Sequence, residues 1–186
     1  ASVCMKLGID LDTIAEGLKS VMGVSGRMES LPAEGFDFSV ILDFAHTPDG
    51  LSNLLSAVQG FAKGRVIAVF GCGGDRDNAK RPIMGATAAK LADFCVVTSD
   101  NPRTEDPTRI INMVLEGVRS EETEYVVIEN RREAIRYALN IAKKDDVVVL
   151  AGKGHENYQE INGIKHPFDE KIIVDEILED MRCGRK

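Results

Sequence analysis

The sequence predicts an α/β protein of the Rossmann-like class, with a mostly parallel sheet, helices on both faces and a C-terminal antiparallel hairpin. Three observations support this prediction. Five short apolar runs lack polar alternation, which is typical of parallel strands buried on both faces. Amphipathic segments separate these runs, and such strand–helix alternation favours a doubly wound sheet. Near the end of the chain, Asn162-Gly163 is a hairpin turn signal between two strand-like segments.

The expected strands are enriched in β-branched and aromatic residues. They span residues 38–43, 65–70, 94–98, 125–128 and 146–150. The segments between them carry apolar residues at spacings of three and four, as helices with one buried face do. These helices are expected to begin near residue types that commonly start helices, at Pro48, Pro82, Pro107 and Asn130.

The two ends of the chain depart from this pattern. Residues 157–161 and 164–168 are expected to pair as the hairpin, followed by a last helix from about 169 to 181. Residues 1 to about 22 carry an apolar face and are expected to be helical, with a link at 23–26. This first segment is too short to fold alone and the chain does not begin with Met. We therefore expect a fragment or processed product that starts with the end of a preceding domain.

Composition narrows the class of protein. The 186 residues carry 44% hydrophobic side chains and a net charge of −7, which predicts a packed core and argues against a non-specific nucleic-acid binder. No apolar run approaches the roughly 18 residues of a membrane span, and the first residues are no signal peptide. The four cysteines include no Cys-x-x-Cys pair, the three histidines lack metal-ligand spacing, and Cys95 is expected to be a buried thiol. These features predict a cytoplasmic protein without membrane or nucleic-acid partners.

Polar loops follow four of the five expected strands. In an open parallel sheet, ligands bind beyond the carboxyl ends of the strands, so these loops are expected to meet at one edge and form a site. The loops comprise residues 43–49, 71–77, 99–105 and 151–156.

Two of these loops contain glycines but no complete nucleotide-binding motif. Arg76 stands where a dinucleotide fingerprint needs its third glycine, and Gly152-Lys153 lacks the upstream glycine and the following Ser or Thr of a P-loop. The glycines are expected either to let the backbone approach a ligand or to form a tight turn.

The loop at 100–103 presents three polar groups around a proline. Arg103 can form two parallel hydrogen bonds with a carboxylate, and Asp100 can accept from an ammonium, so the loop suits a zwitterionic amino acid. The alternative is a simple turn with a solvated arginine.

Together these loops resemble the Mur ligases, and among them the enzymes that add 2,6-diaminopimelate. The similarity covers residues 23 to about 170 and includes several separate motifs in the family's order. The motifs are Gly26-Arg27-Met28-Glu29, the loop 43–49, Gly73-Gly74-Asp75-Arg76-Asp77 with Lys80-Arg81-Pro82, Asp100-Asn101-Pro102-Arg103 and Gly152-Lys153-Gly154-His155-Glu156. Phe44 is a departure, since Tyr is usual there, but the backbone role of that loop should survive it.

The resemblance implies an ATP-dependent amide ligase of three domains that adds meso-diaminopimelate to UDP-N-acetylmuramoyl-L-alanyl-D-glutamate through an acyl phosphate. Residues 1–25 would be the tail of the central ATP-binding domain and a linker, and residues 26–186 the C-terminal amino-acid-binding domain. The sequence contains no P-loop, so this chain alone is expected to be inactive. The ligands of Mg²⁺ are expected mainly in the central domain, and no catalytic residue or metal ligand is assigned here.

The family's motifs imply two groups of site residues. Arg27, Asp43 and His46 would contact ATP, with Asp43 at the ribose. The residues implied for meso-diaminopimelate are Arg76, Asp100, Asn101 and Arg103 at one end, with the Gly152 carbonyl and Glu156 at an ammonium.

Three further residues of the motifs receive no role. Lys153 and His155 are interpreted as solvated or structural, and Arg81 as a surface charge at the start of a helix.

Three other functions remain open. The added amino acid could be lysine, the protein could be a folylpolyglutamate synthetase, or it could be a non-catalytic Rossmann-type ligand-binding domain. The loop at 100–103 distinguishes a diaminopimelate ligase from the first two, because lysine-adding enzymes usually lack its arginine and folate enzymes lack the whole motif.

Overall fold

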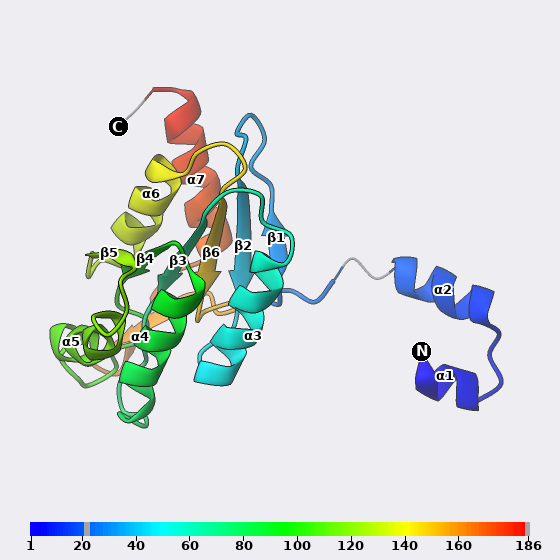
Figure 1. Ribbon diagram of the computed structural model, residues 1–186, viewed down its shortest axis with the longest axis horizontal. Helices are drawn as coiled ribbons and strands as arrows, with labels where there is room; N and C mark the ends of the chain where they lie inside the picture. The colour runs from blue at the N-terminus through cyan, green and yellow to red at the C-terminus, as the bar shows by residue number, and fades with distance from the viewer. Residues whose placement is uncertain (21–22, 185–186) are drawn as a thin grey trace.

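The computed structural model describes residues 1–20 and 23–184, and its centre is a six-stranded sheet in the order β1-β2-β6-β3-β4-β5 (Figure 1). The strands are β1 Glu29–Leu31, β2 Ser39–Asp43, β3 Val66–Phe70, β4 Phe94–Val97, β5 Glu124–Val127 and β6 Val147–Ala151. Strands β2 to β6 pair in parallel, whereas β1 pairs antiparallel with β2. The predicted strands and the mostly parallel sheet are confirmed. Strand β1 was not predicted.

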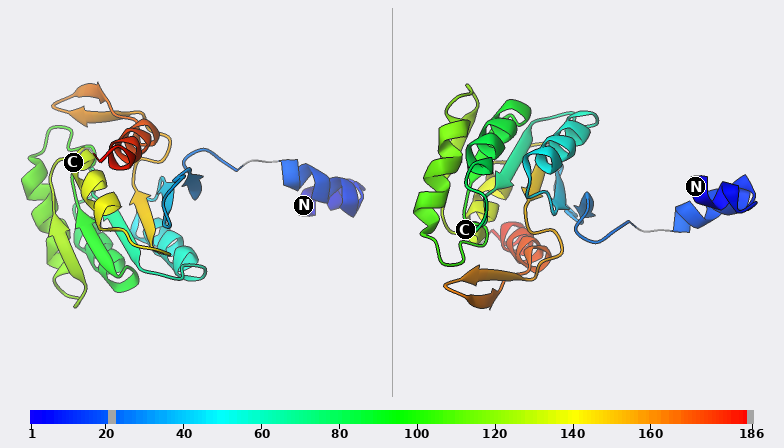
Figure 2. Two further views of the ribbon diagram at one scale, coloured as in Figure 1. Left: turned by 90° about the horizontal axis from the view of Figure 1, so that it is seen from above. Right: turned by 90° about the horizontal axis from the view of Figure 1, so that it is seen from below.

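Helices cover both faces of this sheet, as the sequence predicted (Figure 2). Helices α3 Pro48–Gln59, α4 Lys80–Leu91 and α5 Pro107–Val118 share an apolar core with one face of the sheet. Helices α6 Arg131–Ile141 and α7 Glu170–Arg182 pack on the other face. Alternate residues of β3 enter the two cores, because successive side chains of a strand point to opposite faces.

Side-chain caps start four of these helices close to the predicted positions. Thr47, Asp106, Asn130 and Asp169 each accept a hydrogen bond from a backbone N–H in the first turn. Such caps satisfy donors that the helix itself leaves unpaired. The exception is α4, which begins at Lys80, two residues before the predicted Pro82, and has no side-chain cap.

The strand register brings the polar loops to one level. Asp43 at the end of β2 lies opposite Ala151 of β6, and Phe70 of β3 lies opposite Val97 of β4. The loops that follow these strands therefore leave the same edge of the sheet side by side, which the sequence could suggest only through the general behaviour of parallel sheets.

The predicted hairpin is confirmed as β7 Tyr158–Ile161 and β8 Ile164–Pro167, which form a separate antiparallel pair. Asn162 and Gly163 have φ angles of 51° and 75°, the left-handed conformation that tight hairpin turns need. The hairpin also contacts the main domain, because Arg103 of the β4–α5 loop forms a β-bridge with Ile161 of β7.

The beginning of the chain lies apart from the sheet (Figures 1 and 2). The expected single helical segment is two helices, α1 Ser2–Lys6 and α2 Leu11–Ser20, separated by a turn in which Gly8 has a φ of 78°. Residues 21 and 22, the end of the expected segment, lie outside the described residues. Within the part of the chain that is described, no helix is both long and apolar enough to span a membrane.

The buried thiol predicted for Cys95 is confirmed. Cys95 has no exposed surface, and burial raises its pKa to about 12. The thiol of Cys72 is likewise buried, and its pKa is raised to about 12 by the same cause. Neither thiol is therefore ionised at neutral pH, which argues against nucleophilic roles.

Candidate functional site

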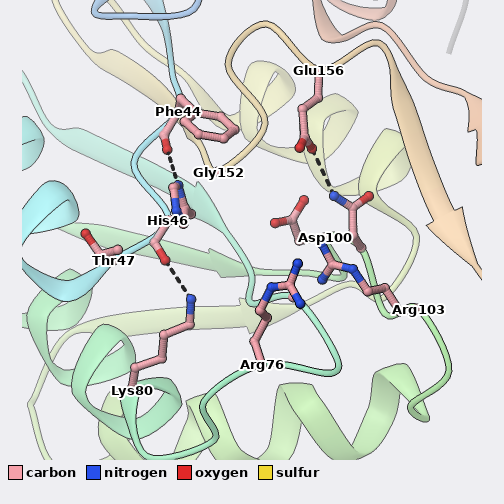
Figure 3. Close-up of a pocket in the computed structure, with 11 residues that line it drawn as sticks. Phe44, His46, Thr47, Arg76, Lys80, Asp100, Arg103, Gly152 and Glu156 are labelled. Atoms are coloured by element: carbon pink, nitrogen blue, oxygen red, sulfur yellow. Dashed lines mark hydrogen bonds between the residues drawn. The ribbon is translucent and has the colours of Figure 1, made fainter.

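A cavity of about 310 Å³ lies beyond the carboxyl ends of the parallel strands (Figure 3). All four predicted polar loops contribute to it. Its lining residues are Phe44, His46, Thr47, Gly73, Arg76, Lys80, Asp100, Asn101, Arg103, Gly152 and Glu156. Seven of the nine residues predicted for the site are in this set, while Arg27 and Asp43 are not. The geometry thus brings together the implied amino-acid residues and one of the implied ATP residues.

The loops after β3 and β4 pack against each other through their backbones. Gly74 donates its N–H to the carbonyl of Asn101 at 2.8 Å. A side chain on Gly74 would collide with the carbonyl of Pro102. Gly74 therefore lets the backbone approach the neighbouring loop rather than a ligand. This contact fixes the positions of Asp100 and Asn101 relative to Arg76.

Arg103 points into the cavity from a constrained position (Figure 3). Its φ of 52° lies in the left-handed region, which is uncommon for a residue with a side chain. Its Nη1 donates to the Gly74 carbonyl at 2.8 Å, and its Nε lies 3.3 Å from Oε2 of Glu160 on β7. Both loop and hairpin therefore hold the guanidinium, and the interpretation of Arg103 as a freely solvated side chain is wrong.

Two carboxylates and an amide lie on another wall of the cavity. Asp100 and Asn101 are buried directly after β4, and the Asn101 Nδ2 donates to Oε2 of Glu156 at 2.9 Å. Gly152 has a φ of 124°, and a Cβ there would lie 3.4 Å from Oδ2 of Asp100. A carboxylate pair beside a carbonyl-bearing glycine is suited to an ammonium group, whereas the two guanidiniums of Arg76 and Arg103 are suited to a carboxylate.

Sequence reasoning missed Lys153, whose side chain is fully buried behind the cavity. Its Nζ donates to Oδ1 of Asn101 at 2.9 Å and to the carbonyl of Tyr158 at 2.8 Å. The interpretation of this lysine as solvated is therefore wrong. The available signal was its place two residues after the end of the entirely buried strand β6.

Arg81 is also buried, so the prediction of a surface charge is wrong. It forms an ion pair with Glu105, with the shortest N–O distance at 2.7 Å. The hydrogen bonds from Arg81, with a further one from the backbone of Asp75, lower the pKa of Glu105 to about 2. The pair joins the start of α4 to the β4–α5 loop.

Of the three residues implied for ATP, His46 lines the cavity, whereas Arg27 and Asp43 lie outside it. The exposed ring of His46 lines the cavity, and its Nδ1 lies 2.8 Å from the carbonyl oxygen of Phe44, which favours the proton on Nδ1. Arg27 lies outside, with its guanidinium carbon 5.0 Å from the centre of the Phe44 ring. Asp43 is buried, and its Oδ2 accepts the N–H of Met28 at 2.7 Å.

Phe44 and Gly26 connect these places through the backbone. The N–H of Phe44 donates to the Gly26 carbonyl at 2.9 Å. That carbonyl lies so close to Gly154 that a Cβ on Gly154 would approach it to 2.7 Å, and a Cβ on Gly26 would fall on the backbone nitrogen of His155. The segment at 24–28 is therefore packed directly against the loop after β6.

The described residues contain no group of three or more His, Cys, Asp or Glu side chains that could hold a metal ion. The cavity instead offers fixed charges of both signs, together with backbone donors and acceptors, beyond the ends of parallel strands. Such a site, at the edge of an open α/β sheet, is suited to a small, charged ligand.

The family of this domain is shown by its sequence. The model of the family described as Mur ligase, glutamate ligase domain, matches residues 26–154, and the chain belongs to this family. It is 51% identical over 180 residues to the UDP-N-acetylmuramoyl-L-alanyl-D-glutamate--2,6-diaminopimelate ligase of Clostridioides difficile, covering 97% of this chain and 37% of that protein. It is 56% identical over 172 residues to the ligase of the same name from Caldanaerobacter subterraneus subsp. tengcongensis, covering 92% of this chain and 35% of that protein.

A solved structure shows the same relationship. A UDP-N-acetylmuramoyl-L-alanyl-D-glutamate--2,6-diaminopimelate ligase superimposes with a TM-score of 0.80 at 39% identity, covering 97% of this chain and 37% of that one. The chain thus spans little more than a third of the length of these relatives.

Proposed function

We propose that this chain is the C-terminal, amino-acid-binding part of an ATP-dependent ligase that adds meso-diaminopimelate to UDP-N-acetylmuramoyl-L-alanyl-D-glutamate in peptidoglycan precursor synthesis. Residues 1–25 are the tail of a central ATP-binding domain with its linker, and residues 26–186 are the C-terminal domain. The observation that carries the proposal is the cavity in which Asp100 and Glu156 oppose Arg76 and Arg103, because it matches a ligand with an ammonium and a carboxylate at the same end. The names of the relatives at about half identity support the same substrate.

The amino acid is oriented by this charge pattern. The ammonium at one end is received by Glu156, Asp100 and the Gly152 carbonyl, and the carboxylate at that end is received by Arg103 and Arg76. Asn101 is held beside them by its hydrogen bond to Glu156 at 2.9 Å. The amine at the opposite end remains free to react, so the cavity binds the part of diaminopimelate that does not form the new amide.

The reaction proceeds through an acyl phosphate. The D-glutamate carboxylate attacks the γ-phosphorus of ATP and releases ADP, and the free amine of the amino acid then displaces phosphate to form the amide. The chain contributes His46 to the nucleotide side of the cavity, with Arg27 and Asp43 on the adjoining segment. The phosphate-binding loop and the Mg²⁺ ligands belong to the part of the ligase outside this chain, and the enzyme acts in the cytoplasm.

The choice of amino acid tests this proposal against a lysine-adding ligase. Diaminopimelate and lysine differ in one carboxylate, and lysine would leave Arg103 facing the cavity without its partner. A site built to hydrogen-bond a group can reject a ligand that lacks it by roughly 10⁴-fold. Steady-state kinetics of the intact ligase with both amino acids should show a kcat/KM ratio of that order. Equal use of lysine would contradict the proposal.

The same assay tests the proposal against a folate ligase and against a non-catalytic binding domain. A folylpolyglutamate synthetase would add glutamate to a folate and ignore diaminopimelate, and a binding domain would bind an amino acid without releasing phosphate. Phosphate release by the intact protein that requires both the UDP-dipeptide and diaminopimelate would separate the proposed function from both.

A further inference from the structure

Lys153 has no role in the proposed function, yet its ammonium lies among the residues assigned to the amino acid. The side chain is fully buried, and its Nζ lies 2.9 Å from Oδ1 of Asn101, 3.3 Å from Oδ1 of Asp100 and 3.6 Å from Oε2 of Glu156. All three partners line the cavity. A buried lysine is costly unless it is paired, and these contacts compensate for its burial.

The contacts of Lys153 determine how the Asn101 amide is oriented. Oδ1 of Asn101 accepts from the Lys153 ammonium at 2.9 Å and from the N–H of Glu160 at 3.0 Å. Two donors on one atom require it to be the oxygen, so the NH₂ group must face the other way. It donates to Oε2 of Glu156 at 2.9 Å, and Lys153 thereby sets the position of Glu156 through Asn101.

Lys153 also determines which carboxylate oxygens of Asp100 and Glu156 contact the protein and which remain available to a ligand. Its ion pair with Asp100 involves the buried Oδ1, at 3.3 Å but without hydrogen-bond geometry. Within the described part of the chain, Oδ2 of Asp100 has no hydrogen-bond partner, and Oε1 of Glu156 has only a long contact of 3.5 Å with the Tyr158 hydroxyl. One oxygen of each carboxylate is therefore left for a ligand.

The ammonium is also anchored by residues that do not line the cavity. It donates to the Tyr158 carbonyl at 2.8 Å, and the rings of Tyr158 and Phe168 lie 5.9 and 5.8 Å from it. These groups belong to the hairpin and the segment that follows it, so Lys153 links the hairpin to the loop after β4. Neither Arg76 nor Arg103 makes any of these contacts in the structure.

We propose that Lys153 is a positioning residue that holds Asp100, Asn101 and Glu156 in the arrangement that receives the substrate's ammonium group. The inference rests on the proposed function, since it assigns the same cavity to the amino acid. Without the lysine, Asp100 and Glu156 would lose the ammonium that lies 3.3 and 3.6 Å from them, and the Asn101 amide would lose one of the two donors that orient it.

The test compares two substitutions in the intact ligase. Lys153→Met keeps most of the volume and removes the charge, whereas Lys153→Ala also leaves space for a small amine. Because each removes contacts to charged groups, the KM for diaminopimelate should rise tenfold or more in both variants, with the KM for ATP and kcat within about threefold of wild type. Lys90→Met, at an exposed position of α4, is the matched control and should change none of these values.

Chemical rescue distinguishes positioning from a merely structural role. Ethylammonium or propylammonium in the assay should lower the diaminopimelate KM of Lys153→Ala toward the wild-type value and leave that of Lys153→Met unchanged. An unchanged KM in both variants would overturn the proposal. A parallel loss of kcat and of affinity for all substrates, without rescue by the amines, would overturn it as well.

A crystal structure of the Lys153→Met ligase separates this inference from the proposed function. If wild type did not use diaminopimelate, the proposed function would fail, but the structure would still decide the role of Lys153. A displaced Glu156 carboxylate or a reoriented Asn101 amide would support the positioning role. Retention of both side chains in their wild-type places would contradict it.

Discussion

The guanidinium of Arg81, which is fully buried, donates to both carboxylate oxygens of Glu105, at 3.0 and 2.7 Å. Glu105 also accepts the backbone N–H of Asp75, so one carboxylate joins α4, the loop after β3 and the loop after β4. The last two loops carry Arg76 and Arg103, the two guanidiniums of the cavity. The Arg81–Glu105 pair therefore fixes the distance between the loops that carry Arg76 and Arg103, although it contacts neither guanidinium.

Glu105→Gln should destabilise the chain by about 1–2 kcal/mol at pH 7, since the carboxylate is partly exposed and solvent screens part of its interaction. The folded-state pKa of Glu105 is about 2, below its ordinary value of 4.5. Its contribution to stability is therefore fully present above pH 4.5 and is lost as the pH falls through 2. Urea denaturation at pH 3 and pH 7 should show a smaller difference between the two proteins at the lower pH.

Glu116→Gln is the control for this measurement, because Glu116 is exposed on α5. It should leave both the free energy of unfolding and its pH dependence close to wild type. A gap between wild type and Glu105→Gln that stayed constant from pH 7 to pH 3 would show that the Arg81 pair does not depress the pKa.

Arg103→Ala should raise the diaminopimelate KM of the intact ligase by about 30-fold or more, the loss expected for a hydrogen bond between charged groups. The KM for ATP should change little, because His46 and Arg27 lie on other loops. Arg119→Ala, at the opposite end of α5, is the control and should leave both KM values unchanged. If Arg103→Ala kept the wild-type KM for diaminopimelate, the main argument that the ligase selects diaminopimelate over lysine would be lost.

Gly154→Ala should destabilise the chain by about 2–4 kcal/mol, through overpacking and an unfavourable backbone conformation. Its φ is 53°, and a Cβ would lie 2.7 Å from both the Gly26 carbonyl and the Phe44 Cβ. Gly163→Ala is the matched control, since its φ is 75° but nothing lies within 4 Å of the added carbon. Denaturation should show a smaller loss at 163, and equal losses would mean that the contact with Gly26 is unimportant.

The 186-residue chain alone should release no phosphate from ATP, with or without UDP-dipeptide and diaminopimelate. Phosphoryl transfer requires a phosphate cradle and metal ligands, and this sequence has no P-loop. A phosphate assay on the purified chain, with the intact ligase as the positive control, checks this expectation. Turnover by the chain above the blank would refute the assignment of ATP chemistry to the remainder of the ligase.

The sequence predicted the elements of the fold better than their boundaries. Continuous apolar runs identified all the parallel strands, because a strand buried on both faces needs no polar alternation. The expected burial is wrong for β5, which lies at the edge of the sheet and is mostly exposed. Strand β1 was missed because it has only three residues and its pairing with β2 is antiparallel at the edge. The first helical segment was predicted as continuous, whereas the left-handed conformation of Gly8 divides it. The order of the strands followed from no local pattern.

The candidate site was predicted through its loops, but the buried cations Lys153 and Arg81 were not predicted. Loops after strands point to a shared edge, so residues such as Asp100 and Glu156 could be grouped before their contacts were known. The solvated interpretation of Lys153 and the surface interpretation of Arg81 were wrong, because Asn101 and Glu105, which pair with these buried cations, come from distant parts of the chain. The loop positions grouped residues 101 and 153 at one edge, but a single sequence does not show that the Lys153 ammonium contacts Asn101 or that Arg81 pairs with Glu105.

The contact between Gly26 and the loop at 154–155 has a mechanical consequence. The backbones of Gly26 and Gly154 are in direct contact there without side chains between them, so the two segments have little room to move relative to each other. A displacement of Gly26 would therefore act on Phe44, to which it is hydrogen-bonded, and on His155, on which it packs. Since Phe44 lines the cavity, the position of Gly26 bears directly on one wall of that cavity.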